Sequence, residues 1–475
     1  MRILFASAEA SPLVKVGGLA DVIGSLPRAL TDLGHEVRTV IPAYSFLSLL
    51  DNQPQDSAPF AVHLPTRSER ASVQSLTLDR GRYFYLIRDS GLLCGPQVYT
   101  DNDLERFLFF NRAVFDLLPQ LNWQPEIVHC HDWHTALVPM WLKHSDLPYA
   151  SVFTIHNLAY QGTASWDFLT SSGLSRFWEN LPPEILNVPS NFMAQGILCA
   201  DAITTVSETY AREITTPEFG DGLDAVLRYR QNDLSGIING IDPDEFNPAV
   251  DCRLAVKYDK ANLEGKHANK LALQRRFRMT ENADIPLIGM VSRLDEQKGF
   301  DIIEPALDQL SQREVQFIIL GRGQERYETV MREAAASHPD KMAAVIDFVG
   351  DLASLIYAGS DVFLMPSRFE PCGLGQMIAM RYGAVPVVRR TGGLADTVPE
   401  VNPNLSEGRG FVFNEYHTDA MLAALDRALT AYYHRDAWDS LVRRIMSTDF
   451  SWRASVMKYE AVYKKALEAR RRAQN

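Results

Sequence analysis

The sequence predicts an α/β protein made of two doubly wound domains, each with a mainly parallel β-sheet. Segments that read as buried strands alternate with amphipathic helices over short connections, which is the pattern of βαβ units. The alternation runs in two series, one up to residue 207 and one from residue 285. Residues 236–251 separate the two series, and their many Asn, Asp, Pro and Gly residues are typical of a crossing between domains.

The first series begins with a strand at residues 2–7, where the apolar run RILFAS ends in a polar loop. Apolar residues at helical spacing predict a helix over residues 21–35, which Gly34 brings to a stop. A second buried strand is expected at residues 36–44. The later elements of this series are strands at 126–133, 150–158 and 201–207 and a helix at 135–144.

The second series follows the same pattern. It predicts strands at 285–294, 315–323, 344–350, 361–367 and 385–390, a helix at 299–310 and a long C-terminal helix at 451–474. In open parallel sheets, ligands bind beyond the carboxyl ends of the strands. Two such domains facing each other make a deep cleft, so we expect the functional residues in the loops that follow strands.

Composition places limits on function. The 475 residues are 46% hydrophobic and 22% charged, as in a globular protein with more than one domain. No apolar run is long enough to cross a bilayer, and Glu9 interrupts the apolar N-terminal run, which argues against a signal peptide. Five widely spaced cysteines are typical of free thiols in a reducing compartment, so a cytoplasmic protein is expected. A net charge of −12 disfavours general binding to nucleic acid or to anionic membranes.

The pentapeptide GGLAD occurs twice, at residues 17–21 and at residues 392–396. Each copy lies between a predicted strand and a predicted helix. Adjacent glycines allow close approach of the backbone, and a helix start offers free N–H groups. Lys15 adds a positive charge beside the first copy. We expect both copies to hold an anionic or hydroxyl-rich ligand against backbone amides; on shape alone, a structural turn is the alternative.

Two stretches of the second series carry candidate groups for a phosphorylated sugar. SRLDEQKGFD places Arg293 and Lys298 after a strand, where a planar fork and a point charge suit a diphosphate. A surface loop with two cations is the alternative. PSRFEPCGLGQ places Glu370 after another strand, where a carboxylate can bind sugar hydroxyls or stabilise a cationic sugar centre. A helix cap or a salt bridge to Arg368 explains Glu370 equally well.

HCHDWH and TIHNLAYQG place polar groups at the ends of two strands of the first series. The three histidines of HCHDWH suggest a metal, but no fourth clustered ligand is evident, so no metal site is predicted. Asp132 is interpreted as a carboxylate that binds hydroxyls. His156 and Asn157 follow the next strand, and a structural role for a lone histidine is the alternative to a ligand contact.

These stretches occur together in a recognisable order. KVGGLADV, HDWHTAL, TIHNLAYQG, INGID, SRLDEQKG, PSRFEPCGL and TGGLADTV follow one another, and as a set they closely resemble the bacterial and plant glycogen and starch synthases that use ADP-glucose. The resemblance spans residue 1 to about residue 460. It implies the GT-B fold, with two Rossmann-like domains facing across a deep cleft and a C-terminal helix that crosses back to the first domain. The domains are then expected at residues 1–240, the acceptor side completed by residues 452–475, and at residues 241–451, the nucleotide-sugar side.

The resemblance also implies an activity. Enzymes of this kind transfer glucose from ADP-glucose to the non-reducing 4-hydroxyl of an α-1,4-glucan, such as glycogen, starch or a maltooligosaccharide, and retain the anomeric configuration. ADP-glucose is then the donor substrate, and neither a metal nor another cofactor is expected. The alternatives are a GT-B transferase that uses UDP-glucose or another acceptor, a glucan phosphorylase with lysine-bound pyridoxal phosphate, and a non-catalytic glucan-binding protein.

The resemblance assigns catalytic roles to four residues. Glu370 and His156 are expected beside the transferring glucose, where Glu370 supports an oxocarbenium-like state. Arg293 and Lys298 are expected to neutralise the diphosphate. The residues expected to bind substrate are Lys15, Gly18, Asp21, Asp132, Asn157, Asn239, Gln297, Phe348, Cys372, Gly373, Gly375, Thr391 and Gly392.

For several of these residues the resemblance also implies which part of the substrate they contact. Lys15 and Gly18 are expected to meet the diphosphate from the first domain, and Phe348 to stack on the adenine. Cys372 is expected near the glucose without acting as a nucleophile. Gly375 departs from the family pattern, which often has a side chain there that assists a phosphate. Sugar hydroxyls are expected to be held by Asp132, Asn157 and Asn239.

Overall fold

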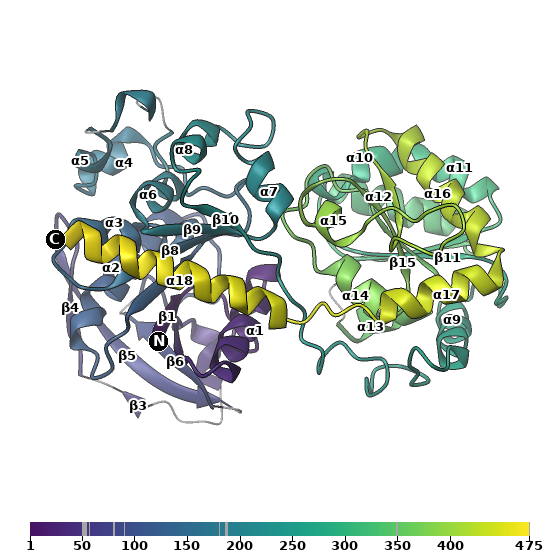
Figure 1. The fold of residues 1–475 in the computed structure, drawn as a ribbon, viewed down its shortest axis with the longest axis horizontal. Coiled ribbons are helices and arrows are strands. Elements are labelled where there is room, and N and C mark those ends of the chain that lie inside the picture. The colour runs from purple at the N-terminus through teal and green to yellow at the C-terminus, as the bar shows by residue number, and fades with distance from the viewer. Residues whose placement is uncertain are drawn as a thin grey trace. The chain divides into compact units, whose positions relative to one another are not determined.

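The computed structural model describes residues 1–49, 55–56, 58–78, 81–89, 91–179, 181–185, 189–347 and 350–474. The chain divides into two compact units (Figure 1). The first unit consists of Met1–Gly240 together with Trp452–Asn475, and the second unit of Ile241–Ser451. Each unit is built around a mainly parallel β-sheet on which helices pack.

The sheet of the first unit extends well beyond its parallel part. Its strands are β1 (Arg2–Ala6), β2 (Glu36–Pro42), β3 (Gln55–Asp56), β4 (Phe60–His63), β5 (Ser68–Leu78), β6 (Arg82–Arg88), β7 (Ile127–His131), β8 (Ala150–Ile155), β9 (Ala202–Thr205) and β10 (Leu234–Gly236). They lie in the order β10-β9-β8-β7-β1-β2-β6-β5-β3, with β4 paired to β5. From β10 to β6 all neighbours are parallel, whereas β5 pairs antiparallel with β6, β3 and β4.

The helices of the first unit are α1 (Gly18–Asp32), α2 (Asp103–Leu117), α3 (Leu137–Lys143), α4 (Trp166–Ser171), α5 (Arg176–Glu179), α6 (Phe192–Cys199), α7 (Glu208–Glu213), α8 (Asp224–Tyr229) and α18 (Arg453–Gln474). The central parallel strands are almost completely buried and mostly apolar, apart from the two histidines of β7 and a Ser and a Thr in β8. In β8, for example, all six residues are buried. The helix predicted over residues 21–35 begins and ends three residues earlier, as α1.

The C-terminal helix α18 belongs to the first unit. It packs on β7, β8, β9 and α1. Tyr459 and Tyr463 are completely buried in the same apolar cluster as strand β1. The indole of Trp452, just before the helix, donates a hydrogen bond to the hydroxyl of Ser25 at 2.8 Å. The helix therefore completes the core of the first unit.

The second unit has a wholly parallel sheet in the order β13-β12-β11-β14-β15-β16. Its strands are β11 (Leu287–Val291), β12 (Gln316–Leu320), β13 (Met342–Val345), β14 (Val362–Met365), β15 (Val385–Arg389) and β16 (Phe411–Phe413). Its helices are α9 (Glu264–Arg276), α10 (Phe300–Ile303), α11 (Leu307–Gln312), α12 (Glu325–Ser337), α13 (Gly350–Gly359), α14 (Gly375–Arg381), α15 (Gly392–Thr397), α16 (Thr418–Tyr432) and α17 (Arg435–Met446).

Two predicted elements of the second unit differ from the structure. The single helix expected at residues 299–310 is divided into α10, a 3-10 turn at Glu304–Ala306 and α11. Pro305 lies in that turn, and a proline cannot donate the backbone hydrogen bond that a continuous helix needs. The strand expected at residues 344–350 is observed as β13, which ends at Val345. Phe348 lies outside the described residues.

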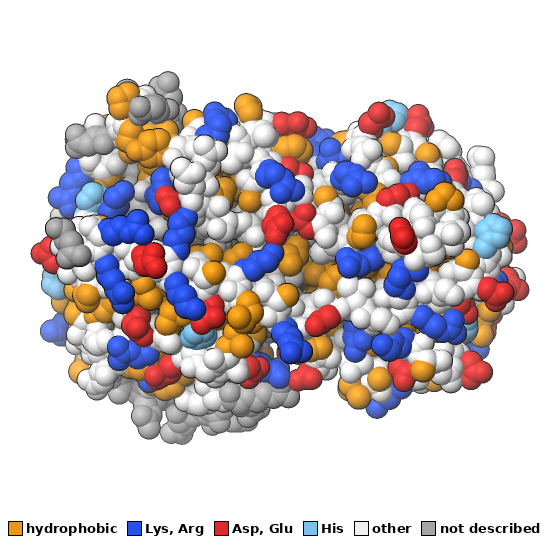
Figure 2. Space-filling model, viewed as in Figure 1, with side chains coloured by type: hydrophobic (Ala, Val, Ile, Leu, Met, Phe, Trp, Pro, Cys, Tyr) orange, Lys and Arg blue, Asp and Glu red, His pale blue; other side chains and the backbone are white. Residues whose placement is uncertain are grey.

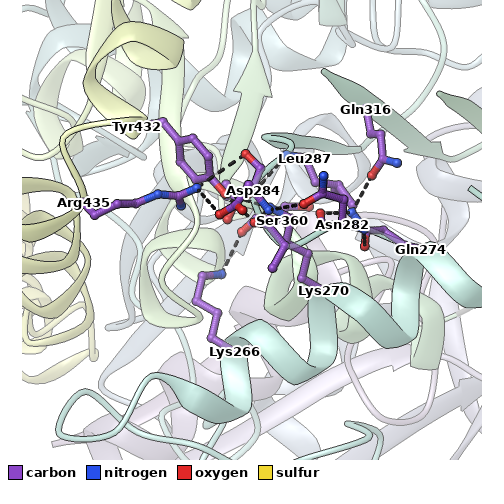
Figure 3. A network of polar contacts seen from close by, with 12 residues as sticks. Lys266, Lys270, Gln274, Asn282, Asp284, Leu287, Gln316, Ser360, Tyr432 and Arg435 are labelled. Atoms are coloured by element: carbon purple, nitrogen blue, oxygen red, sulfur yellow. Dashed lines mark hydrogen bonds and ion pairs between the residues drawn. The ribbon is translucent and has the colours of Figure 1, made fainter. Parts of the chain in front are cut away.

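Buried polar side chains tie α9 to the sheet of the second unit (Figure 3). The ammonium of Lys266 donates to the carbonyl oxygens of Ser360 at 2.7 Å and Ala358 at 3.0 Å, near the end of α13. Lys270 lies one helical turn further and pairs with the carboxylate of Asp361 at 2.7 Å. The same carboxylate accepts a hydrogen bond from the backbone N–H of Leu287 at 2.9 Å. These contacts satisfy charges that would be costly to bury alone.

The surface is of mixed charge. On the face shown in Figure 2, Lys and Arg side chains are interspersed with Asp and Glu side chains over both units. Among the described residues, no helix combines the length and apolar character needed to span a bilayer.

Candidate active site

In the first unit, candidate residues meet where β7 and β8 end. The two strands are parallel neighbours, with His131 paired to Thr154, so the residues that follow them share one edge of the sheet. The Asp132 carboxylate accepts hydrogen bonds from the backbone N–H of His156 at 2.7 Å and of Asn157 at 3.5 Å. Asp132 has a φ of 55°, a conformation that costs energy in a residue other than glycine. Burial raises the pKa of the Asp132 carboxyl to about 7.

One oxygen of Asp132 is therefore used to hold the neighbouring loop, which sequence reasoning did not anticipate. Its second oxygen, Oδ2, makes no hydrogen bond to any residue that the structure describes. A ligand hydroxyl can donate to this oxygen. The side-chain oxygen of Asn157 accepts from the backbone N–H of Ala159 at 3.1 Å. Asn239 is buried, and its side-chain oxygen lacks a hydrogen-bond partner within the described chain, which suits a ligand donor.

Four histidines lie at or near this edge, and burial keeps their rings neutral. The pKa of His134 and of His156 is lowered to about 3. The pKa of His129 and of His131 is lowered well below the ordinary value. His129 uses both ring nitrogens, one with the hydroxyl of Tyr463 at 3.0 Å and one with Thr154 at 2.6 Å. Within the described ranges, no group of three or more His, Cys, Asp and Glu side chains is placed to hold a metal ion.

Glu9 organises the first GGLAD segment. One carboxylate oxygen of Glu9 accepts hydrogen bonds from the backbone N–H of Val16 at 2.6 Å and of Gly17 at 2.9 Å. The other oxygen accepts from the hydroxyl of Tyr99. Glu9 is only 2% exposed. The amide of Gly17 is thus engaged by a carboxylate of the protein itself, and the expected ligand contact is left to Gly18 and the start of α1.

The exposed cation beside this loop is already paired. The ammonium of Lys15 donates to the carboxylate of Asp21 at 2.6 Å. Gly17 and Gly18 are exposed, and a Cβ atom added to either would meet no atom within 4 Å. The space above these glycines is open to a ligand, and the internal pair holds Lys15 beside it.

In the second unit, Arg293 follows β11 in a loop with internal partners. Its guanidinium pairs with Asp295 at 2.8 Å and donates to the side-chain oxygen of Gln297 at 2.9 Å. Asp295 also accepts from the backbone N–H of Lys298 at 3.0 Å and caps the 3-10 turn Glu296–Lys298. The backbone oxygen of Gln297 accepts from the N–H of Arg368, which ties this loop to the one after β14.

Glu370 and Lys298 form the centre of the candidate site in the second unit. They are 72 positions apart in sequence, and Lys298 Nζ lies 2.6 Å from Glu370 Oε2. The same oxygen accepts from the hydroxyl of Ser367 at 3.0 Å, and Glu370 is 5% exposed. The sequence also allowed a salt bridge between Glu370 and Arg368. In the structure Arg368 pairs with Asp301 at 2.8 Å instead.

The remaining candidate residues surround Glu370. Cys372 is buried, and Gly373 adopts a left-handed φ of 69°, which turns the chain toward α14. Gly375 is the first residue of α14, and Thr391 is the buried residue before α15. Gly392 packs so closely on the backbone of Glu370 that an added Cβ would lie 2.0 Å from its carbonyl oxygen. The second GGLAD segment therefore supports the loop of Glu370 and does not present an open pair of glycines.

Comparisons with known proteins agree on one assignment. Residues 2–229 match the starch synthase catalytic domain family, and residues 274–444 match the glycosyl transferases group 1 family. A glycogen synthase from Moorella thermoacetica is 46% identical over 100% of this chain and 98% of its own length. One from Gloeobacter violaceus is 44% identical over 98% of this chain and 99% of its own. This chain belongs to the glycogen and starch synthase family.

Solved structures of the family and its relatives give the fold. The catalytic domain of starch synthase IV from Arabidopsis thaliana, bound to ADP and acarbose, has a TM-score of 0.89 and 32% identity and covers 98% of this chain and 99% of its own. A sucrose-phosphate synthase from Thermosynechococcus elongatus has a TM-score of 0.63 at 17% identity, over 98% of this chain and 99% of its own, which is a likeness of fold. The expected GT-B fold and the expected family are confirmed.

Four residues of the site were missed by sequence reasoning. Asp295 lies between Arg293 and Lys298 in the sequence, so an ion pair with one of these cations could have been predicted. Glu9 was considered only as a charge that interrupts an apolar run. Ser367 lies within PSRFEPCGLGQ but was given no role, and Tyr99 lies in no distinctive pattern. Only the fold brings their hydroxyls to Glu370 and Glu9.

Proposed function

We propose that this protein transfers glucose from ADP-glucose to the non-reducing 4-hydroxyl of an α-1,4-glucan, with retention at the anomeric carbon. Family membership supports a nucleotide-sugar donor and a glucan acceptor. The observation that carries the proposal is the Lys298–Glu370–Ser367 cluster after β11 and β14, where a cation and a buried carboxylate lie together. Adenosine as the nucleoside is supported by the ADP bound in the similar starch synthase IV.

The second unit supplies the groups that a departing diphosphate needs. Asp295 holds Arg293 in place, and Glu370 holds Lys298. Preorganised cations stabilise charge that develops on a leaving group, because they need not reorient during the reaction. In the first unit, Lys15 is the exposed cation at the open glycine loop.

Glu370 is the carboxylate for the sugar. Its Oε2 atom is occupied by Lys298 and Ser367, which leaves Oε1 for a hydroxyl of glucose or for the partial positive charge at its ring. A retaining glycosidase of the two-carboxylate type uses a nucleophile about 5 Å from its acid. An ADP leaving group needs no acid of that kind once its charge is met.

The chemical step balances without a cofactor. The bond between C1 of glucose and the diphosphate oxygen breaks, and ADP leaves with the electron pair. The 4-hydroxyl oxygen of the acceptor bonds to C1 from the same face. Its proton passes to the departing diphosphate oxygen. No metal or other cofactor is assigned a role in this proposal.

Parallel transfer assays test the proposal. The full chain is incubated with glycogen and either ADP-glucose or UDP-glucose, each with and without EDTA, and glucose incorporation is measured. We expect strong transfer from ADP-glucose that EDTA does not change. Replacing Arg293 or Lys298 by Gln should lower kcat/KM by about 100-fold. Arg326→Gln is the matched control, because Arg326 lies in an exposed ion pair with Glu304.

The other outcomes overturn defined parts of the proposal. Preference for UDP-glucose would keep the chemistry and reject the donor. Transfer that EDTA abolishes would reject the metal-free step. Absence of transfer from either donor, with glycogen still bound, would reject the transferase and favour a glucan-binding protein.

A further inference from the structure

His131 and His156 are joined by a hydrogen bond between their rings. His131 is the last residue of β7, and His156 directly follows β8, the neighbouring parallel strand. The Nδ1 atom of His131 lies 3.0 Å from Nε2 of His156, and the two rings are inclined by 38°. The contact is thus produced by the register of the two strands.

Such a contact fixes where the protons are. A neutral imidazole carries one N–H donor and one bare nitrogen that accepts. Burial keeps both rings neutral by lowering the pKa of each. One ring must therefore donate and the other accept, and the direction decides which nitrogen of His156 carries its proton.

The surroundings of His131 decide the direction. Its other nitrogen, Nε2, is buried and has no hydrogen-bond partner among the residues that the structure describes. The ring of Phe5 stacks on His131 with centroids 5.1 Å apart, and the ring of His129 lies 4.1 Å away. His129 offers no hydrogen-bonding group there, because Tyr463 and Thr154 occupy both of its nitrogens. A proton on Nε2 of His131 would be a buried donor without an acceptor, which folded proteins rarely contain.

We propose that His131 sets the tautomer of His156: His131 donates from Nδ1–H to Nε2 of His156, so that His156 carries its own proton on Nδ1. The main chain of His156 is held as well, because Asp132, the residue after His131, accepts its backbone N–H at 2.7 Å. Two consecutive residues at the end of β7 thereby orient both the ring and the backbone of His156.

The consequence is a defined chemical role for His156. The residue is only partly buried as a whole, and Nδ1 makes no hydrogen bond within the described part of the chain. His156 presents an N–H donor to a ligand at this edge, and its one lone pair is occupied by His131. It can therefore bind an oxygen of the substrate or of the transition state, and it cannot remove a proton as a general base. This role rests on the proposed function, whereas the tautomer itself does not.

Nitrogen-15 NMR of the full chain labelled at histidine reads the tautomer without any substrate. The His156 signals are identified by their loss in His156→Gln. We expect the protonated nitrogen of His156 to be Nδ1 in the unaltered protein. Observation of a proton on Nε2 of His156 would overturn the proposal. Because the measurement needs no glucose transfer, it stands even if the proposed function fails.

Two substitutions separate hydrogen bonding from packing. His131→Asn keeps an N–H near the position of Nδ1, whereas His131→Leu removes it. We expect the Nδ1–H form of His156 to persist in the Asn variant and to be lost in the Leu variant. His134→Leu is the matched control, because it removes a neighbouring buried ring with no hydrogen bond to His156. An unchanged tautomer in His131→Leu would overturn the proposal.

Kinetics give the second readout. We expect His131→Leu to lower kcat by about 10- to 100-fold, as losses of groups that orient a functional histidine do. His131→Asn should recover most of that loss. Equal losses in the two folded variants, with the Nδ1–H form of His156 kept only in His131→Asn, would overturn the positioning role.

Discussion

The two GGLAD segments have identical residues and similar places in the fold, yet their surroundings differ. Each opens a helix that follows a parallel strand, α1 after β1 and α15 after β15. The glycines at 17 and 18 are exposed with open space above them, whereas those at 392 and 393 are buried. At Gly393 an added Cβ would lie 2.0 Å from the carbonyl oxygen of Cys372. Neighbouring residues decide whether a glycine pair stays open or supports another loop.

The same contrast extends to the charges around the two segments. In the first unit a carboxylate, Glu9, fixes the glycine loop itself. In the second unit the carboxylate of Glu370 faces Lys298, and its backbone is what the glycines contact. The first segment is itself held by a carboxylate and stays open, and the second packs against the backbone of Glu370. The predictions below test that division.

The largest effect is expected at the residue that the second segment supports. Glu370→Ala should lower kcat by about 1000-fold, because the sugar loses its carboxylate and Lys298 loses its partner. Steady-state transfer to glycogen measures the change, with thermal unfolding as the check on folding. Near-normal turnover would show that the loop after β14 does not act on the sugar.

The glycines themselves give the next largest effect. Gly393→Ala should destabilise the second unit by about 3 kcal/mol, because its Cβ would overlap the backbone of Cys372. Gly18→Ala is the matched substitution in the first segment and should change stability by less than about 0.5 kcal/mol. Urea unfolding of both variants gives the comparison. Equal destabilisation would remove the distinction between the two segments.

Acid should weaken the first unit through its buried histidines. His134 and His156 have folded pKa values of about 3, below an unfolded value of 6.5, so the unfolded chain binds more protons as the pH falls between those values. Asp132, with a folded pKa of about 7, acts in the opposite direction, and its effect on stability is smaller than that of the two histidines together. These three groups together give a loss of about 2 kcal/mol between pH 6.5 and pH 4.5. The lowered pKa values of His129 and His131 add to this loss.

Hydrogen exchange resolved by segment measures this loss. Amides of β7 and β8 should lose protection on acidification more than those of β11 and β12 in the second unit. His134→Leu should reduce the pH dependence of the first unit. Equal acid sensitivity of the two sheets would contradict the account.

The smallest effect is expected at the carboxylate under the open loop. Glu9→Gln keeps an oxygen acceptor for Val16 and Gly17 but removes the charge, so the first unit should lose about 2 kcal/mol or less. The KM for the sugar nucleotide should rise while kcat changes little. A fall in kcat with KM unchanged would place Glu9 in the chemical step instead.

Most of the fold could be predicted from the sequence, because buried parallel strands are recognisable by their apolar residues. Strands buried on both faces, such as β1 and β8, are mostly apolar, and β7 carries two buried histidines beside its apolar residues. The antiparallel strands β5 and β6 were not predicted: polar residues interrupt β5, and the apolar run within β6 was not recognised as a strand. Pro305 was overlooked as a break in an otherwise helical pattern.

The sequence predicted where the site residues lie in the fold better than it predicted which side chains contact one another. Asp132 and His156 could be placed together because neighbouring parallel strands end at the same edge. The pairing of Lys298 with Glu370 was not predicted, because β12 and β13 lie between β11 and β14 in the chain, and only the folded sheet makes β11 and β14 neighbours. The hydrogen bond from the Gly17 amide to Glu9 was also missed. The sequence of a glycine pair does not show which acceptor its backbone N–H groups bind.

The path of α18 gives the first unit an unusual order of assembly. On the ribosome, the whole second unit, residues 241–451, emerges before the helix that covers β7, β8 and β9. Until that helix docks, His129 lacks the Tyr463 hydroxyl that binds its ring, and the apolar cluster beneath it is uncovered. The domain that is synthesised first is therefore the one that is completed last, and the histidine-rich edge of its sheet acquires its final form only at that moment.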